Sequence, residues 1–269
     1  MLTRLLALLA AFALAAPAAA GTVVVHAGRL IADASQPARG PSTITVLRRR
    51  IASAADDLQP APAGARLIDL SARTVLPGLI DSHVHLSGDP GGDYWREAVE
   101  SDEYWTLVGA KNARLTLRAG FTTVRDLGSP PLVGHALARA TEEGLVPGPR
   151  ILSSGPAISI VGGHGDVTGF RPRGIEALSA RNTCTGAEEC ARRVRELARA
   201  GADVIKFTAT GGVLSQQARG LEAHFTDAEM RAIVDTAHSL GLRVAAHAHG
   251  ARGIEAAARA GEDSIGERT

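Results

Sequence analysis

The sequence lacks several features that mark particular classes of protein. Its 269 residues carry 29 basic and 28 acidic side chains, so no excess of positive charge favours a nucleic-acid partner. Aromatic residues make up only 3% of the chain, and it has only two cysteines. Lysine is scarce as well, because Lys111 and Lys206 are the only lysines beside many arginines. Hydrophobic residues make up 45% of the chain, which is enough for a sizeable core. The length corresponds to one large domain or to one and a half domains.

Long apolar runs are confined to the first twenty residues. Arg4, the apolar segment Leu5–Ala16 and the small residues Ala18-Ala19-Ala20 predict a secretory signal peptide over residues 1–20. The apolar segment is short for a membrane span, and an uncleaved anchor is the alternative. We therefore expect a mature chain that starts near Gly21. It would have no stable membrane span after cleavage and would be periplasmic or secreted, in an oxidising compartment.

The two cysteines suit such a compartment. Cys184 and Cys190 lie six positions apart, just before a helical pattern. A disulfide between them would close a short loop and contribute about 2 kcal/mol. Zinc binding by this pair is the weaker alternative, because the chain has no further cysteine to complete a site. Spacing alone does not decide between the two.

The pattern of apolar residues divides the mature chain into two parts. Residues 21–75 read as a small β module with strands over Thr22–Val25, Ser42–Leu47 and Arg66–Leu70, and with a turn over residues 48–53. Residues 76–269 alternate apolar strands with helical patterns, which is typical of parallel βα units in an α/β fold. The expected strands are Leu79–Val84, Thr122–Asp126, Arg150–Ser153, Asp203–Thr208, Leu242–Ala246 and Glu262–Ile265. The expected helices are Glu103–Ala119, Pro131–Glu143, Ala187–Ala200, Thr226–Leu240 and Gly253–Ala260.

Polar side chains with metal-binding or reactive groups fall where these strands end. The candidates are His83, His85, Asp126, Lys206, His247 and His249. His83 and His85 follow a Pro-Gly turn and lie two residues apart, as do His247 and His249. Side chains at i and i+2 point to the same face of a strand, so each pair can bind a zinc-like metal. The alternative for the first pair is a strand with two half-buried polar residues. In a (β/α) barrel the active site lies at the face where the strands end.

Lys206 and His164 are the two further candidates. Lys206 stands inside an apolar strand, where an unpaired ammonium is costly to bury. Because arginine is the usual cation of this chain, a lysine here indicates an amine that can lose its proton and react. The alternative is a stem along apolar surface with its amine in water. His164 lies in the glycine-rich loop Gly162–Asp166, where backbone can approach a ligand closely, or it is a loop histidine with a solvent partner.

Several stretches together resemble a known family. The first, Leu76-Pro-Gly-Leu-Ile-Asp-Ser-His-Val-His85, is similar to the opening metal motif of the amidohydrolase superfamily. Other stretches are similar to its imidazolonepropionase-like and prolidase-like metallo-dipeptidase branch. They are Gly120–Gly128, Gly155–Asp166, Gly201–Phe207 with Thr210–Val213, and Ala246–Gly250. The resemblance covers nearly the whole mature chain.

The resemblance implies a (β/α)8 TIM-type barrel after a small β-sandwich module, with two divalent metal ions, expected to be zinc. His83 and His85 would bind the first metal, and a carbamylated, catalytic Lys206 would bridge both. His247 would bind the second metal and His249 would lie nearer the substrate, although the assignment between these two stays open. His164 would be a catalytic residue that contacts the substrate. A hydroxide bridging the metals would attack the scissile carbonyl.

The sequence departs from the family pattern at its end. The family has a histidine after the sixth strand, where this chain reads Ser264-Ile-Gly-Glu-Arg-Thr269, and an aspartate after the eighth strand. We therefore expect an incomplete barrel of about six strands, truncated or frame-shifted near Gly266.

The predicted function is zinc-dependent hydrolysis of an amide or peptide C–N bond in a small substrate such as a dipeptide. The alternatives are a cyclic-amide hydrolase or deaminase on the same scaffold, or a catalytically incomplete fragment. No nucleic-acid partner is expected, and the sequence does not indicate an oligomeric state.

Overall fold

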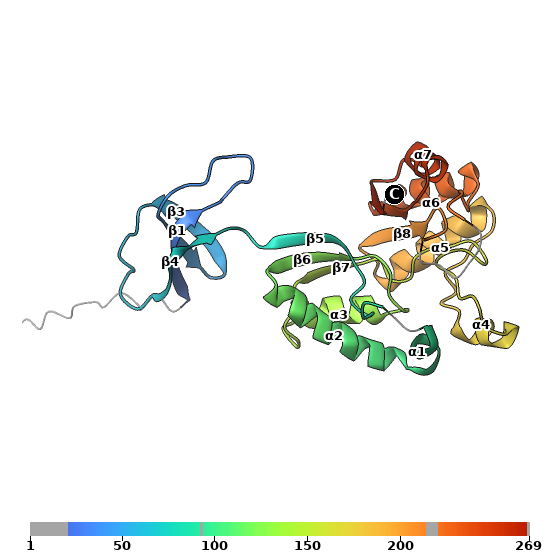
Figure 1. Cartoon of the computed structure of the whole chain (residues 1–269), viewed down its shortest axis with the longest axis horizontal. Coiled ribbons are helices and arrows are strands. Elements are labelled where there is room, and N and C mark those ends of the chain that lie inside the picture. The colour runs from blue at the N-terminus through green and yellow to red at the C-terminus, as the bar shows by residue number, and fades with distance from the viewer. Residues whose placement is uncertain (1–20, 92–93, 214–219, 268–269) are drawn as a thin grey trace, which may run out of the picture. The chain divides into compact units, whose positions relative to one another are not determined.

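A computed structural model describes residues 21–91, 94–213 and 220–267, and the predicted signal peptide lies outside these ranges (Figure 1). The chain divides into two compact units, residues 1–77 and residues 78–269. Each unit is described by itself. Among the described residues, no helix combines the length and the apolar character needed to cross a membrane.

The first unit holds one four-stranded sheet in the order β3-β2-β1-β4. Its strands are β1 (Thr22–Leu30), β2 (Ser42–Leu47), β3 (Arg50–Asp56) and β4 (Arg66–Val75). β1 pairs antiparallel with β2 and parallel with β4, and β2 pairs antiparallel with β3. Buried Ala27, Leu30 and Ile44 form its small core. The described residues of this unit form a single sheet, so the second layer of a β-sandwich stays a prediction.

The prediction of a turn over residues 48–53 is wrong beyond its first residues. Arg48 and Arg49 have φ angles of 47° and 65°, and β3 begins directly after them. Positive φ at both central residues is the geometry of a tight two-residue hairpin. Glycine or asparagine normally marks such a turn, so two arginines gave no signal of a hairpin in the sequence.

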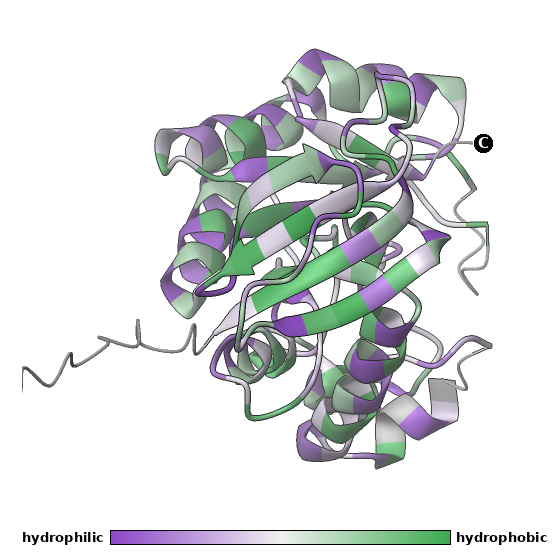
Figure 2. Cartoon of the chain, turned by 90° about the vertical axis from the view of Figure 1, so that its left-hand side faces the viewer, coloured by the Kyte–Doolittle hydropathy of each residue, from purple (hydrophilic) through white to green (hydrophobic). Residues whose placement is uncertain are grey.

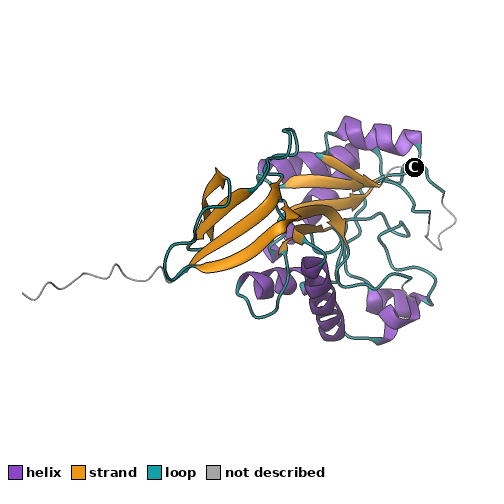
Figure 3. Ribbon diagram, turned by 60° about the vertical axis from the view of Figure 1, so that its left-hand side comes forward, coloured by secondary structure: helices purple, strands orange, loops and turns teal. Residues whose placement is uncertain are grey.

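In the described part of the second unit, six strands occur, each at a predicted position. Figure 3 draws the strands in orange. They are β5 (Leu79–Val84), β6 (Phe121–Asp126), β7 (Arg150–Ser153), β8 (Val204–Thr208), β9 (Arg243–His247) and β10 (Ser264–Glu267). They pair in the orders β5-β6-β7 and β8-β9-β10. A parallel bridge between Ile158 and Phe207 joins the segment after β7 to β8, with Ile158 N donating to Lys206 O over 2.8 Å. The strand ends therefore follow one another in chain order, as in the βα units of a TIM-type barrel.

Helices alternate with these strands and pack on them. They are α1 (Tyr94–Val99), α2 (Asp102–Arg118), α3 (Val133–Glu142), α4 (Pro172–Leu178), α5 (Ala187–Ala200), α6 (Asp227–Ser239) and α7 (Ala251–Ala260). α2 packs on β6 and α3, α3 on β7, and α6 on α5, α7 and β9. Figure 2 shows hydrophobic residues concentrated on the strands, while the helices carry both hydrophilic and hydrophobic residues. This pattern buries one stripe of α2, α3, α5, α6 and α7, whereas α4 has no buried residue.

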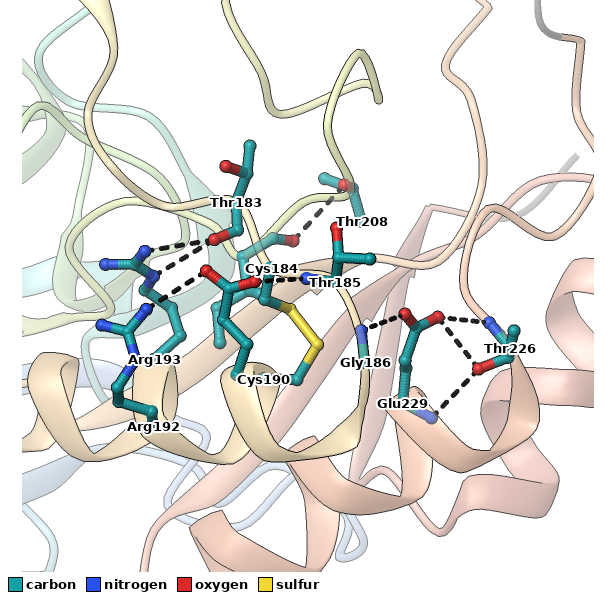
Figure 4. The surroundings of a disulfide bond; sticks show 12 residues. Thr183, Cys184, Thr185, Gly186, Cys190, Arg192, Arg193, Thr208, Thr226 and Glu229 are labelled. Atoms are coloured by element: carbon teal, nitrogen blue, oxygen red, sulfur yellow. Dashed lines mark hydrogen bonds and ion pairs between the residues drawn. A yellow bond between two sulfur atoms is a disulfide. The ribbon is translucent and has the colours of Figure 1, made fainter.

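The largest core cluster lies around β8, β9, α5 and α6, and it includes both cysteines. Cys184 and Cys190 are joined by a disulfide (Figure 4). Thr226 caps α6 in a capping box with Glu229, as the sequence predicts. The same Glu229 accepts a hydrogen bond from Gly186 N through Oε1 over 2.7 Å, so the cap of α6 also holds the disulfide loop.

Candidate metal centre

The two histidines at the end of β5 point their Nε2 atoms at the same place. His83 Nε2 and His85 Nε2 lie 3.2 Å apart. His85 Nδ1 lies 3.0 Å from Gly128 O, and His83 N donates to Asp81 Oδ1 over 3.0 Å. Because a carbonyl oxygen can only accept, Nδ1 of His85 carries the proton and Nε2 keeps its lone pair for a metal. Burial, and then the charge of Lys206, lowers the pKa of His83 to about 4, which keeps the ring of His83 neutral.

Glu267, at the end of β10, connects this pair to two other strands. Its Oε1 lies 3.3 Å from His83 Nε2 and 3.0 Å from His247 Nδ1, and its Oε2 lies 3.4 Å from Lys206 Nζ. Burial works to raise the pKa of Glu267, but the hydrogen bond from His247 and the charge of Lys206 hold this pKa at about 2. The carboxylate is therefore ionised in the middle of the cluster.

Lys206, on β8, is the partner of Glu267 Oε2. It lies in β8, where all five side chains are buried, and its own exposure is 2%. Burial lowers the pKa of its ammonium, while the nearby Glu267 carboxylate works in the other direction. An ammonium buried this deeply needs a partner, and Glu267 provides one.

Three more predicted residues gather beside this cluster. The ring centroids of His164 and His247 lie 4.2 Å apart, and those of His247 and His249 lie 4.7 Å apart. His249 N donates to Thr210 Oγ1 over 2.9 Å. Burial, and then the charge of His247, lowers the pKa of His164 to about 4. The His164 ring is therefore neutral at physiological pH and can accept a proton or bind a cation.

Asp126, at the end of β6, is buried and contacts the backbone just after the first histidine pair. Its Oδ1 accepts a hydrogen bond from Leu86 N over 3.0 Å. Burial raises the pKa of this carboxyl to about 6, although the bond from Leu86 N opposes the rise. Asp126 therefore contacts the backbone that directly follows His85.

This donor set fits a divalent metal ion. The candidate ligand atoms of His83, His85 and Glu267 all lie within 4.8 Å of one another. Imidazole nitrogens with a carboxylate oxygen are a usual zinc ligand set. The sequence does not single out Glu267, because the family pattern has a histidine at the end of the sixth strand. The only signal was an acidic side chain at that strand end.

Comparison with known proteins agrees with this architecture. The family model described as "Amidohydrolase family" matches residues 74–269. The chain belongs to the amidohydrolase family. The predicted superfamily is therefore confirmed. An ochratoxinase from Aspergillus niger is 32% identical over 267 residues, which cover 91% of this chain and 54% of that enzyme.

Solved structures of this family share the fold. A Xaa-Pro dipeptidase crystallised with methionine in its active site superposes with a TM-score of 0.80 at 33% identity, over 91% of this chain and 61% of that one. The crystal structure of the A. niger ochratoxinase superposes with a TM-score of 0.79 at 27% identity, over 91% of this chain and 60% of that one. The prolidase-like branch predicted from the motifs is thus represented among the relatives. The chain spans about half of the length of the curated relatives that it matches.

Proposed function

We propose that this chain forms the metal-binding part of a zinc-dependent hydrolase that cleaves an amide C–N bond in a small substrate, a dipeptide in the first instance. One observation carries the proposal: His83, His247 and Lys206, from three different strands, meet at the carboxylate of Glu267. The relatives, an ochratoxinase and a Xaa-Pro dipeptidase, support hydrolysis of small molecules.

Each of these residues would have a separate role at the metal centre. His83 and His85, whose Nε2 atoms lie 3.2 Å apart, would hold the first of two divalent ions, and Glu267 and His247 would complete the donor set. Such ions supply Lewis-acid activation of water and of a carbonyl group when they are bound. His164 and His249 would orient the substrate from the next loops, and the buried walls around them would exclude water.

Lys206 would act as a carbamate that bridges the two ions. Its 2% exposure and its lowered pKa support this role, because the amine that has lost the ammonium proton can form an N–C bond to carbon dioxide, and a second proton then leaves the nitrogen for solvent to give the carbamate. The predicted signal peptide supports a periplasmic or secreted protein, and the disulfide between Cys184 and Cys190 suits that oxidising location.

A second candidate is hydrolysis of a cyclic amide by the same residues. It rests on a match to an allantoinase from Streptomyces avermitilis, 31% identical over 183 residues, which cover 65% of this chain and 37% of that enzyme. A panel of dipeptides beside ring amides separates the two candidates.

The test uses the whole purified chain loaded with zinc, before and after chelation. We expect dipeptide hydrolysis that chelation abolishes, that His83→Ala loses, and that His26→Ala keeps, since His26 lies in the first unit and contacts Gln59 O. Hydrolysis that survives both chelation and His83→Ala would contradict the proposal. Zinc binding without turnover would favour the alternative of a catalytically incomplete chain.

A further inference from the structure

Asp126 makes one hydrogen bond whose position is significant for the metal centre. Its side chain is fully buried, and its Oδ1 accepts from Leu86 N over 3.0 Å. Leu86 directly follows His85, so this bond fixes the backbone at the point where the ligand-bearing strand leaves the sheet. A buried backbone N–H that loses its acceptor destabilises the local conformation, because water cannot replace the missing partner.

Leu127 and Gly128, which follow Asp126, also form hydrogen bonds with the ligand strand. Leu127 N donates to Val84 O over 3.0 Å, and Gly128 O accepts from His85 Nδ1 over 3.0 Å. The segment 126–128 therefore contacts the backbone on both sides of His85 and also its ring. Hydrogen bonds of this kind set the tautomer and the direction of a metal-binding imidazole.

The position of Asp126 is itself fixed by close packing. A Cβ atom placed on Gly134, in the first turn of α3, would lie 2.7 Å from Asp126 Oδ2. The same atom would lie 2.5 Å from Ser129 Oγ and 2.2 Å from Ser153 Oγ. The carboxyl group and two hydroxyl groups thus gather under a glycine of α3, which leaves Asp126 little freedom to turn away from Leu86.

We propose that Asp126 is a positioning residue that holds the segment Val84–Leu86 so that His85 presents Nε2 to the metal. It acts through the hydrogen bond to Leu86 N and not through its charge. The inference rests on the proposed metal centre, because it assigns a role toward the same ligands.

The test compares Asp126→Ala with Asp126→Asn in the whole chain. Asparagine keeps an acceptor at the Oδ1 position and can donate from its amide to the nearby serine hydroxyls, whereas alanine removes the acceptor. Affinity for Co²⁺ is measured by titration of its visible absorption. We expect about 10- to 100-fold weaker binding in Asp126→Ala, the range seen when outer partners of ligands are lost, and at most about threefold in Asp126→Asn.

Asp203→Ala is the matched control. Asp203 also accepts from a backbone N–H, but that N–H belongs to Ser153 in β7 and not to the ligand strand. We expect its Co²⁺ affinity to stay within about threefold of the wild type. Equal affinity of Asp126→Ala and the wild type would overturn the inference. An equal loss in Asp126→Ala and Asp126→Asn would also overturn it, because charge and not the hydrogen bond would then be the cause.

Two further measurements separate positioning from folding and from metal binding. If Asp126→Ala does not fold, Asp126→Ser replaces it, since a serine hydroxyl is too short to reach Leu86 N. Amide exchange at Leu86 and the ¹⁵N shifts of His85 report on the metal-free protein. Faster amide exchange and a changed His85 tautomer in the Ala or Ser variant, but not in Asp126→Asn, would support the inference. This support would hold even if the wild type binds no Co²⁺. Absence of Co²⁺ binding would contradict only the proposed function. Unchanged exchange and shifts would overturn the inference.

Discussion

At the scale of single residues, two glycines pack directly against histidine rings of the metal centre. A Cβ atom on Gly128 would lie 3.0 Å from the ring of His85, and one on Gly212 would lie 2.4 Å from the ring of His164. Gly128 also has a φ of 152°, which disfavours other residues. The rings therefore sit where they do because these positions have no side chain.

Gly212→Ala should push the ring of His164 out of its place. Burial is the main reason that the pKa of His164 is lowered to about 4, so a displaced and more solvated ring should titrate at higher pH. A histidine titration by NMR measures this pKa. Gly40→Ala is the control, because no atom lies within 4 Å of a Cβ there. An unchanged titration of His164 in Gly212→Ala would contradict the close packing.

The candidate residues could largely be found from the sequence, because their chemistry and their position at strand ends are both local features. His83, His85, Lys206, His247 and His164 do gather in one place. Glu267 shows only the weaker signal of an acidic side chain at a strand end. Its role depends on contacts with residues far away in the chain, and nothing in its own neighbourhood marks it as a partner of Lys206.

At the scale of elements, the loop that carries His164 is held by Asn182. The side-chain amide of Asn182 donates to Ala157 O over 2.5 Å and to Gly165 O over 2.8 Å, and its residue exposure is 5%. One buried side chain thus closes the loop over residues 157–165. Asn182 lies outside the loop in sequence, so the glycine-rich sequence of the loop does not reveal this contact.

Asn182→Asp should release this loop at almost constant side-chain volume. The new carboxylate oxygen would face two carbonyl oxygens and could not donate to either of them. Leaving such groups unsatisfied costs about 1–3 kcal/mol, and we expect the free energy of unfolding to fall by at least this amount. Chemical denaturation measures it, with the exposed Gln36→Glu as the same chemical change elsewhere. Equal stability of both variants would show that Asn182 does not hold the loop.

The disulfide is the second device that holds this region. Cys184 and Cys190 are 1% and 0% exposed, so alanine replaces them without burying a polar group. We expect Cys184→Ala with Cys190→Ala to lower the free energy of unfolding by about 2 kcal/mol, as estimated for so short a loop. Urea unfolding of the double variant beside the oxidised wild type measures the difference. Wild type under reducing conditions should lose a similar amount, and no loss in either case would contradict the role of the bridge.

Element prediction succeeded where the start or end of an element is marked by a local residue. The glycines after α5 and α7 end these helices with φ angles of 105° and 91°, as expected of left-handed caps. α4 escaped prediction although Pro172 stands at its first turn, because it is short and none of its residues is buried. β3 escaped because an Arg-Arg turn precedes it.

At the scale of the whole molecule, Asp263 ties neighbouring strands together and makes stability depend on pH. It accepts from Val244 N over 2.8 Å and from His238 over 2.9 Å, and it pairs with Arg243. Burial works to raise the pKa of Asp263, but the bonds from Arg243 and His238 hold this pKa at about 2. Because the unfolded value is about 3.9, the ionised group stabilises the fold above that pH. The contribution is lost as the pH falls from about 4 to about 2.

Asp263→Asn should therefore be less stable than the wild type at pH 6, by about 1 kcal/mol after solvent screening. The difference should shrink below pH 4 and disappear near pH 2. Urea unfolding at several pH values measures it, with the exposed Asp235→Asn as control. A difference that stays constant from pH 6 to pH 2 would show that the charge of Asp263 does not contribute.

The alternation of strands and helices in the sequence predicts the parallel arrangement of the second unit. Parallel strands that alternate with helices place their carboxyl ends on one side, and the polar residues stand at those ends. The closeness of the first and sixth strands at Glu267 and His83, 3.3 Å apart, was not predictable, because it depends on the twist summed over all six strands.

The most direct test of the metal centre is X-ray absorption at the zinc edge on the whole purified chain after dialysis. We predict retained zinc with histidine nitrogen and carboxylate oxygen ligands at about 2.0–2.2 Å. The His83→Ala, His85→Ala double variant should lose this zinc, while His26→Ala should keep it. A wild type that retains no zinc, or a double variant whose zinc and ligand shell are unchanged, would contradict the assignment of these strand ends as a metal site.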